Sequence, residues 1–155
     1  MLRETLLVFM ALAVFVNATN VDKCNGVEND NTKNVEVSGC KNPPCKFKKG
    51  TEISMEQRFV AERDVQDVKN AVHAVIAGVP LPFIGVDGTD ACNLIYNADG
   101  SPAGCPLTKD QEYLFKVSFP ILPFYPKVPL TVHYELSGND QNTVACFEVP
   151  AKITD

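Results

Sequence analysis

Six cysteines are the residues whose type and spacing point most directly to a chemistry, which is the formation of disulfide bonds. An even number of cysteines is typical of a disulfide framework when the chain is exported, and the apolar N-terminal run predicts export. Two close pairs enclose turn residues, which leaves two cysteines near the ends of the mature chain. The favoured pairs are Cys40 with Cys45, Cys92 with Cys105, and Cys24 with Cys146. A zinc site is the alternative, although the spacings are not those of a finger or ribbon.

Candidates for catalysis are few. The two histidines, His73 and His133, each fall on the polar side of an expected strand, and no recognisable motif supplies a nucleophile for either. The sequence has no Gly-rich phosphate loop, no His-Glu-x-x-His and no nucleophile elbow. Asp87 and Asp90 form a carboxylate pair in a loop, where solvation is the simpler interpretation. The sequence therefore predicts a protein that is not an enzyme and that uses no metal or cofactor.

Two expected loops carry more apolar side chains than surface loops usually do. The first, residues 78–85, contains Leu81, Phe83 and Ile84. The second, residues 119–126, has proline at every third position, as in polyproline II. Because proline cannot join a central ladder, the second stretch should lie at an edge or rim. Either both stretches cap the ends of the core, or they form the mouth of a ligand site.

A basic cluster contrasts with the net charge of −5 and consists of Lys41, Lys46, Lys48 and Lys49. One interpretation is a solvated turn and edge strand, where lysine discourages aggregation. The alternative is docking to anionic lipid headgroups. The acidic balance of the whole chain argues against nucleic acid as a partner.

Residues 1–18 predict a secretory signal peptide that is not part of the fold. Arg3 gives a positive start, and an apolar run from Leu6 to Val16 is too short to span a bilayer. Modest and small residues at 16–18 suit cleavage. A retained signal anchor is the alternative. We therefore expect one exported domain over residues 19–155.

Apolar and polar residues alternate along most of the mature chain, as they do in half-buried strands. The alternating segments are residues 34–37, 51–61, 113–119, 130–136 and 145–149. Residues 65–77 are ambiguous because their valines also recur at helical spacing, but the valine content and the Gly78-Val79-Pro80 stop favour a strand. We predict an all-β, immunoglobulin-like sandwich of six to seven antiparallel strands with three disulfides.

Five short motifs occur in an order that resembles one family. They are Cys24 near the mature start, Ser-Gly-Cys-x4-Cys at 38–45, Gly-Val-Pro-Leu-Pro-Phe at 78–83, Cys-Pro-Leu-x-Lys at 105–109 and Ala-Cys-Phe-Glu-Val-Pro-Ala-Lys-Ile at 145–153. Together they are similar to the ML-domain (MD-2-related lipid-recognition) family. Within it, the likeness is to Niemann–Pick type C2-like (epididymal secretory) proteins of the arthropod kind, to which the group 2 mite allergens are related. The resemblance covers essentially the whole mature chain.

The resemblance implies a seven-stranded immunoglobulin-like sandwich whose sheets splay to hold a sterol or fatty acid. It also implies the three disulfides that spacing favours. The ligand-binding residues expected on this basis are Phe83, Ile121, Tyr125 and Pro126 at the pocket mouth, with Leu81 and Val132 beside them.

Sequence and resemblance together predict a secreted lipid-binding or transfer protein that carries a sterol, a fatty acid or a related apolar small molecule. We expect a monomer that is extracellular or in the lysosomal lumen, and that contacts membranes or a lipid-accepting membrane protein transiently. The alternative from another functional class is an innate-immune recognition module that binds microbial glycolipids and acts through a receptor partner.

Overall fold

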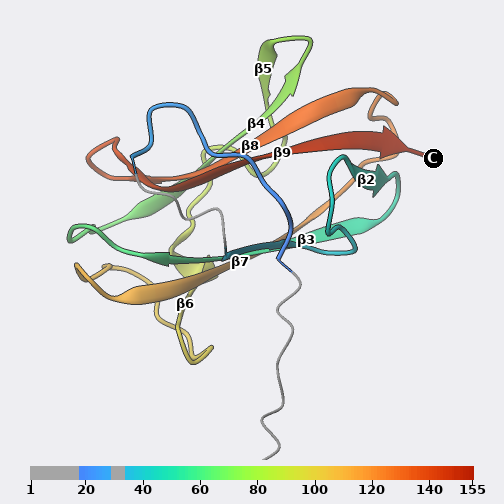
Figure 1. Cartoon of the computed structure of the whole chain (residues 1–155). Coiled ribbons are helices and arrows are strands. Elements are labelled where there is room, and N and C mark those ends of the chain that lie inside the picture. Colours follow the sequence, from blue (N-terminus) through green and yellow to red (C-terminus); the bar gives the residue numbers. More distant parts are fainter. Residues whose placement is uncertain (1–17, 29–33) are drawn as a thin grey trace, which may run out of the picture.

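The computed structural model describes residues 18–28 and 34–155, so the predicted signal peptide lies outside the described residues except for Ala18. Figure 1 shows two β-sheets packed face to face. The described part of the chain contains nine strands and the 3-10 helix η2: β1 (Val35–Val37), β2 (Cys45–Lys48), β3 (Glu52–Val60), β4 (Val68–Ile76), β5 (Val79–Pro82), η2 (Cys92–Leu94), β6 (Ile95–Asn97), β7 (Glu112–Pro120), β8 (Pro129–Gly138) and β9 (Thr143–Thr154).

The strands form a four-stranded sheet in the order β1-β3-β7-β6 and a five-stranded sheet in the order β2-β9-β8-β4-β5. The predicted all-β sandwich is therefore confirmed. The prediction of six to seven strands is too low, because β2, β5 and β6 each have only three or four residues, which is too few for periodicity to identify them. The strands pair antiparallel except β2 and β9, which run parallel. In that pair, β9 lies beside the short edge strand β2. The periodicity of the sequence could not predict this parallel pairing.

Alternation of side chains explains why the long strands form. In β3, Ile53, Met55 and Phe59 are buried while Ser54 and Arg58 are exposed, so one face of the strand packs inward. The strands β7 and β8 repeat this pattern from opposite sheets. The ambiguous segment 65–77 contains strand β4, as the valine content predicted.

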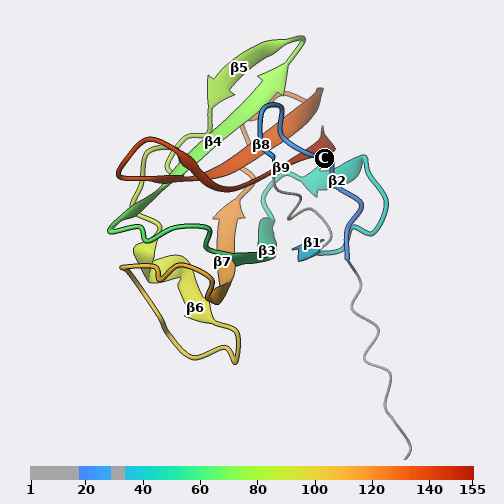
Figure 2. The same cartoon turned by 60° about the vertical axis from the view of Figure 1, so that its left-hand side comes forward.

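The connection after β4 differs from the prediction. Gly78 does not end the extended structure; Ala77 (φ 49°) and Gly78 (φ 80°) form a two-residue turn that folds the chain back as strand β5. Positive φ at both turn positions suits the right-handed twist of a hairpin. The β4–β5 hairpin projects at the top of the views in Figures 1 and 2. Pro80 and Pro82 lack N–H groups, so β5 is a poor template for pairing with another strand.

All three predicted disulfides are present. Cys24 is bonded to Cys146 in β9, which ties the N-terminal segment to the five-stranded sheet. The other two bonds, Cys40–Cys45 and Cys92–Cys105, close short loops.

The core between the sheets is rich in aromatic rings. Phe115 of β7 packs against Tyr134 of β8, with 5.3 Å between ring centroids, and Tyr134 stacks on Phe147 of β9 at 5.9 Å. The Tyr134 hydroxyl donates a hydrogen bond of 3.0 Å to Asn70 Oδ1 on β4. Burial raises the pKa of Tyr134, so this hydroxyl stays protonated. No helix in the described residues is long and apolar enough to cross a bilayer.

Candidate functional site

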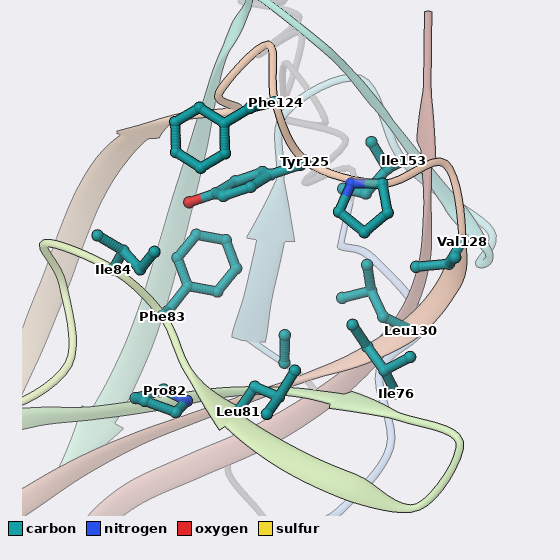
Figure 3. Close-up of a pocket in the computed structure, with 12 residues that line it drawn as sticks. Ile76, Leu81, Pro82, Phe83, Ile84, Phe124, Tyr125, Val128, Leu130 and Ile153 are labelled. Carbon is teal, nitrogen blue, oxygen red and sulfur yellow. The ribbon is translucent and has the colours of Figure 1, made fainter.

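An apolar pocket of about 270 Å³ opens at one end of the sandwich. The β4–β5 hairpin and the two residues after it form one side, and the β7–β8 connection with the nearby ends of β8 and β9 forms the other (Figure 3). Its lining consists of Ala74, Ile76, Leu81, Pro82, Phe83, Ile84, Phe124, Tyr125, Pro126, Val128, Leu130 and Ile153. The pocket thus lies where the two apolar stretches of the sequence meet.

Four aromatic rings lead from solvent to the core along this pocket. Phe124, which is 71% exposed, contacts Tyr125 with ring centroids 5.4 Å apart. The Tyr125 ring lies 5.9 Å from that of Phe83, and Phe83 in turn lies 5.0 Å from Phe119, which is 2% exposed. All three contacts are edge-to-face, a geometry that attracts aromatic rings beyond simple burial. Figure 3 shows Phe83 beneath Tyr125 at the centre of the pocket.

The two sides of the pocket are held differently. The Phe83 N–H donates to Val72 O of β4 at 2.9 Å, and the Asp87 carboxylate accepts a bond of 2.8 Å from the Val72 N–H. Asp87 is therefore a structural residue and not simply a solvated one. On the other side, the backbone hydrogen bonds made by residues 122–127 are local within the described chain, as in Tyr125 N–H to Leu122 O. The β7–β8 connection is thus the side with fewer restraints on opening.

The chemistry of the pocket is almost wholly apolar. The Tyr125 hydroxyl is the one polar side-chain group among the lining residues, and burial raises its pKa, so it is neutral and able to donate or accept a hydrogen bond. Among the residues that the structure describes, no charged side chain lines the pocket. Such a site suits a hydrophobic body with a polar group at its outer end. The volume is just below the range of about 300–1,000 Å³ usual for small-molecule sites, so a larger ligand requires the walls to separate.

The predicted site residues are only partly brought together. Leu81, Phe83, Tyr125 and Pro126 line the pocket. Ile121 and Val132 do not; both are fully buried in the core. Their predicted contact with a ligand remains a prediction, as it does for the lining residues.

Several lining residues were not predicted. Ile84 and Phe124 belong to the apolar stretches but are not among the expected ligand-binding residues, and nothing in the sequence indicated their high exposure. The remaining ones come from the strands and their connections: Ala74, Ile76, Pro82, Val128, Leu130 and Ile153. The sequence did indicate that the Leu130 side chain faces inward, because Leu130 lies on the apolar face of residues 130–136.

The two histidines lie together on the outer face of the five-stranded sheet. Their ring centroids are 6.1 Å apart. His133 Nδ1 is 3.0 Å from a Glu148 carboxylate oxygen, and His133 Nε2 is 3.3 Å from one of Glu135. The Cys24–Cys146 disulfide lies beside this ring, and because both sulfurs are oxidised they offer no thiolate to a zinc ion. The cluster is therefore two ion pairs of His133, one with Glu135 on its own strand β8 and one with Glu148 on the neighbouring strand β9.

These ion pairs give stability a dependence on pH. The hydrogen bond to Glu135, opposed by burial, raises the pKa of His133 above its ordinary 6.5, and the bond to His133 lowers the pKa of Glu135 below its ordinary 4.5. The raised histidine pKa stabilises the fold below pH 6.5, and this is lost as pH rises through the folded-state value. The lowered glutamate pKa stabilises above pH 4.5 and is lost as pH falls.

We therefore expect the cluster to contribute most between pH 4.5 and 6.5. Urea unfolding measured from pH 4 to 9 should show this contribution: the urea concentration at the unfolding midpoint should fall as the pH rises on the alkaline side. In His133→Gln that alkaline fall should be smaller, while Lys116→Gln, far from the cluster on β7, should leave it unchanged. An unaltered alkaline limb in His133→Gln would contradict the assignment.

The basic cluster lies at an edge of the five-stranded sheet. Lys46 and Lys48 are exposed on edge strand β2, and Lys49 pairs with Asp155 at 3.5 Å. Asp155 also pairs with Lys127, next to the pocket. This placement fits protection of an edge strand. Docking to lipid headgroups stays a prediction.

Comparisons with known protein families, sequences and structures all point to the same family. A family model described as the ML domain matches residues 18–153. The NPC intracellular cholesterol transporter 2 homolog a of Drosophila melanogaster is 33% identical over 155 residues, which cover 99% of this chain and 99% of the fly protein. The NPC intracellular cholesterol transporter 2 of Canis lupus familiaris is 32% identical over 123 residues, covering 78% of this chain and 76% of the dog protein. The crystal structure of a Niemann-Pick type C2 protein from Japanese carpenter ant superposes with a TM-score of 0.65 at 27% identity, covering 77% of this chain and 89% of the ant chain.

Proposed function

This chain belongs to the ML domain family, and from that premise we propose that it is a lipid-binding and lipid-transfer protein that holds a sterol or fatty-acid-like ligand between its two sheets. The observation that carries the proposal is the apolar pocket at the end of the inter-sheet core. The fly and dog relatives named as intracellular cholesterol transporters support the same ligand class.

Burial of apolar surface supplies the affinity. Each Å² of apolar ligand surface removed from water contributes about 25 cal/mol. The pocket walls offer this burial without charged partners, and Tyr125 provides one hydrogen-bonding group at the entrance for a hydroxyl or carboxyl. Entry requires the aromatic contacts of Phe83 and Tyr125 to separate, since together they close the route to Phe119.

The finer assignments are part of the proposal. The chain acts without catalysis, as a carrier that is exported after cleavage before Thr19, and it releases lipid to a membrane or to a lipid-accepting membrane protein. The exposed Ile84 and Phe124, at 66% and 71%, border the pocket and offer apolar contact with such an acceptor.

The test is to identify the ligand that the protein retains. The mature chain, expressed with its disulfides formed, is incubated with cholesterol, oleic acid, a long-chain hydrocarbon and a lipid A glycolipid at equal concentration, and the complex is analysed by native mass spectrometry. We expect one molecule of sterol or fatty acid per chain, and a thermal midpoint that rises with ligand concentration.

Each outcome decides between functions. Sterol retention supports transfer of sterol, and fatty-acid retention supports carriage of acyl ligands. Selective retention of the glycolipid would replace the proposal with a recognition module. Retention of none of the four would show that the pocket is not a lipid site, and the exposed apolar residues would then be better explained as a protein-binding surface.

A further inference from the structure

A glutamine lies inside the core with part of its amide unpaired. Gln57 occupies an inward position of β3, between the buried Met55 and Phe59, and is 1% exposed. Its register partners are Val35 of β1 and Phe115 of β7, both fully buried. The side-chain nitrogen Nε2 has no hydrogen-bond partner among the described residues.

This amide differs from the other buried polar side chains. Asn70 donates to Thr89 and accepts from the Tyr134 hydroxyl, and the Thr19 hydroxyl donates to Cys40 O and accepts from the Val37 N–H. Buried polar groups in native proteins are nearly always paired, because an unpaired donor loses its bonds to water without replacement. The unpaired Nε2 group is therefore a cost in the unliganded molecule that a ligand acceptor would remove.

The position of Gln57 relative to the pocket is set by strand register. Phe119 forms the inner end of the aromatic series, and it pairs with Ile53. Gln57 lies four residues further along β3, opposite Phe115. At about 3.3 Å per residue, that is roughly 13 Å deeper between the sheets. An elongated ligand that enters past Phe83 and parts the sheets would bring its far end toward this amide.

From this geometry we infer that Gln57 binds an oxygen atom at the inner end of the ligand. The inference rests on the proposed function, since it requires a lipid between the sheets. The ligand class is an elongated apolar molecule with polar groups at both ends: one for Tyr125 at the entrance, and a hydroxyl, carbonyl or ester oxygen for Gln57 Nε2. The Tyr134 hydroxyl, whose ring packs against Phe115, lies on the opposite sheet near the same depth. Its hydrogen is given to Asn70, so it offers a ligand hydroxyl an acceptor.

Matched ligand pairs test the inference. Cholesterol is compared with cholesterol hydroxylated at the end of its side chain, and octadecanol with octadecanediol hydroxylated at both ends. Within each pair the outer end is constant and only the inner end changes. Affinities are measured by competition for one fluorescent fatty-acid probe, with the wild type, Gln57→Leu and Gln57→Met.

We expect the wild type to bind the doubly oxygenated member of at least one pair as tightly as its partner or more tightly. In both Gln57 variants the ratio of affinities within that pair should fall by about tenfold, because the inner oxygen is then buried without a donor. Tyr125→Phe is the matched control: it removes a hydroxyl at the entrance, so it should change both members of a pair alike.

A ratio that stays the same in both Gln57 variants, while binding itself persists, overturns the inference and leaves the proposed function intact. So does a wild type that prefers the ligand without the inner oxygen in both pairs. If the wild type binds neither the fluorescent probe nor any of the four ligands, the proposed function itself fails. If neither variant folds, the NMR resonances of the Gln57 side-chain amide in the wild type provide the test. They should shift downfield only with the ligand that carries the inner oxygen. Equal spectra with both members of a pair would count against the inference.

Discussion

Replacing Cys24 and Cys146 together with alanine will lower the free energy of unfolding by about 5 kcal/mol. The bond joins residues 122 positions apart and so closes nearly the whole domain into one loop. In the loop-entropy treatment, a loop of this length restricts the unfolded chain by roughly 4.7 kcal/mol or slightly more. Since domains are stable by about 5–15 kcal/mol, the variant should be close to unfolded at 37 °C.

The Cys40→Ala, Cys45→Ala double variant is the internal comparison. That bond spans only 5 positions, and the same treatment gives it about 2 kcal/mol. Urea unfolding of both double variants and the wild type, followed by circular dichroism at one pH, measures the difference. Equal losses in the two variants would mean that local packing around each bond, and not restriction of the unfolded chain, sets their contributions.

The disulfide arrangement also bears on how a lipid carrier stays folded. A pocket at the end of the inter-sheet core gives up part of the tight packing that stabilises other domains of this size. The Cys24–Cys146 bond compensates for this loss of stability by restricting the unfolded chain. Stabilisation of this kind requires no rigid contact between the two sheets. Both of its cysteines lie on the side of the five-stranded sheet, so the bond itself does not cross between the two sheets.

Much of the sandwich could be predicted because its long strands are half-buried. Alternation in residues 51–61, 113–119 and 130–136 reports directly which side chains face the core. Strands β5 and β6 lack this alternation, and β2 alternates over only four residues, which is too short a stretch to identify a strand. Strand β5 was expected to be a loop because Ala77 was not recognised as a residue that could accept positive φ before Gly78.

The site was predictable only where its residues form local runs. Leu81 and Phe83 lie in one apolar stretch and Tyr125 in the other, so the sequence indicates them without a fold. Ile153 is different: it reaches the pocket only because β9 is central in the five-stranded sheet and pairs with both β2 and β8. Ile121 shows the opposite case, since it lies in an apolar run of the sequence but does not line the pocket. Its backbone bonds to Gly50 and Thr51 hold it behind the pocket, in the core.

The second large effect concerns the entrance. Phe83→Ala should speed lipid release about 5- to 140-fold. Opening the pocket requires Phe83 to separate from Phe119 and Tyr125, and each edge-to-face contact contributes about 0.5–1.5 kcal/mol beyond burial. Two such contacts amount to about 1–3 kcal/mol, and 1.4 kcal/mol corresponds to a factor of ten in rate. Stopped-flow transfer of a fluorescent sterol to acceptor vesicles measures the release rate.

Phe124→Ala is the matched control, because Phe124 is also a phenylalanine of the pocket lining but is exposed and has only Tyr125 as an aromatic neighbour in the described chain. Extrapolated to zero vesicle concentration, the release rate of Phe124→Ala should exceed that of the wild type by about 2- to 12-fold. This is the factor expected from the loss of one aromatic contact. If Phe83→Ala and Phe124→Ala speed release equally, the barrier lies outside the buried contacts. If only Phe124→Ala slows transfer when vesicles are added, Phe124 acts in contact with the acceptor membrane, whereas Phe83 governs the opening of the protein itself.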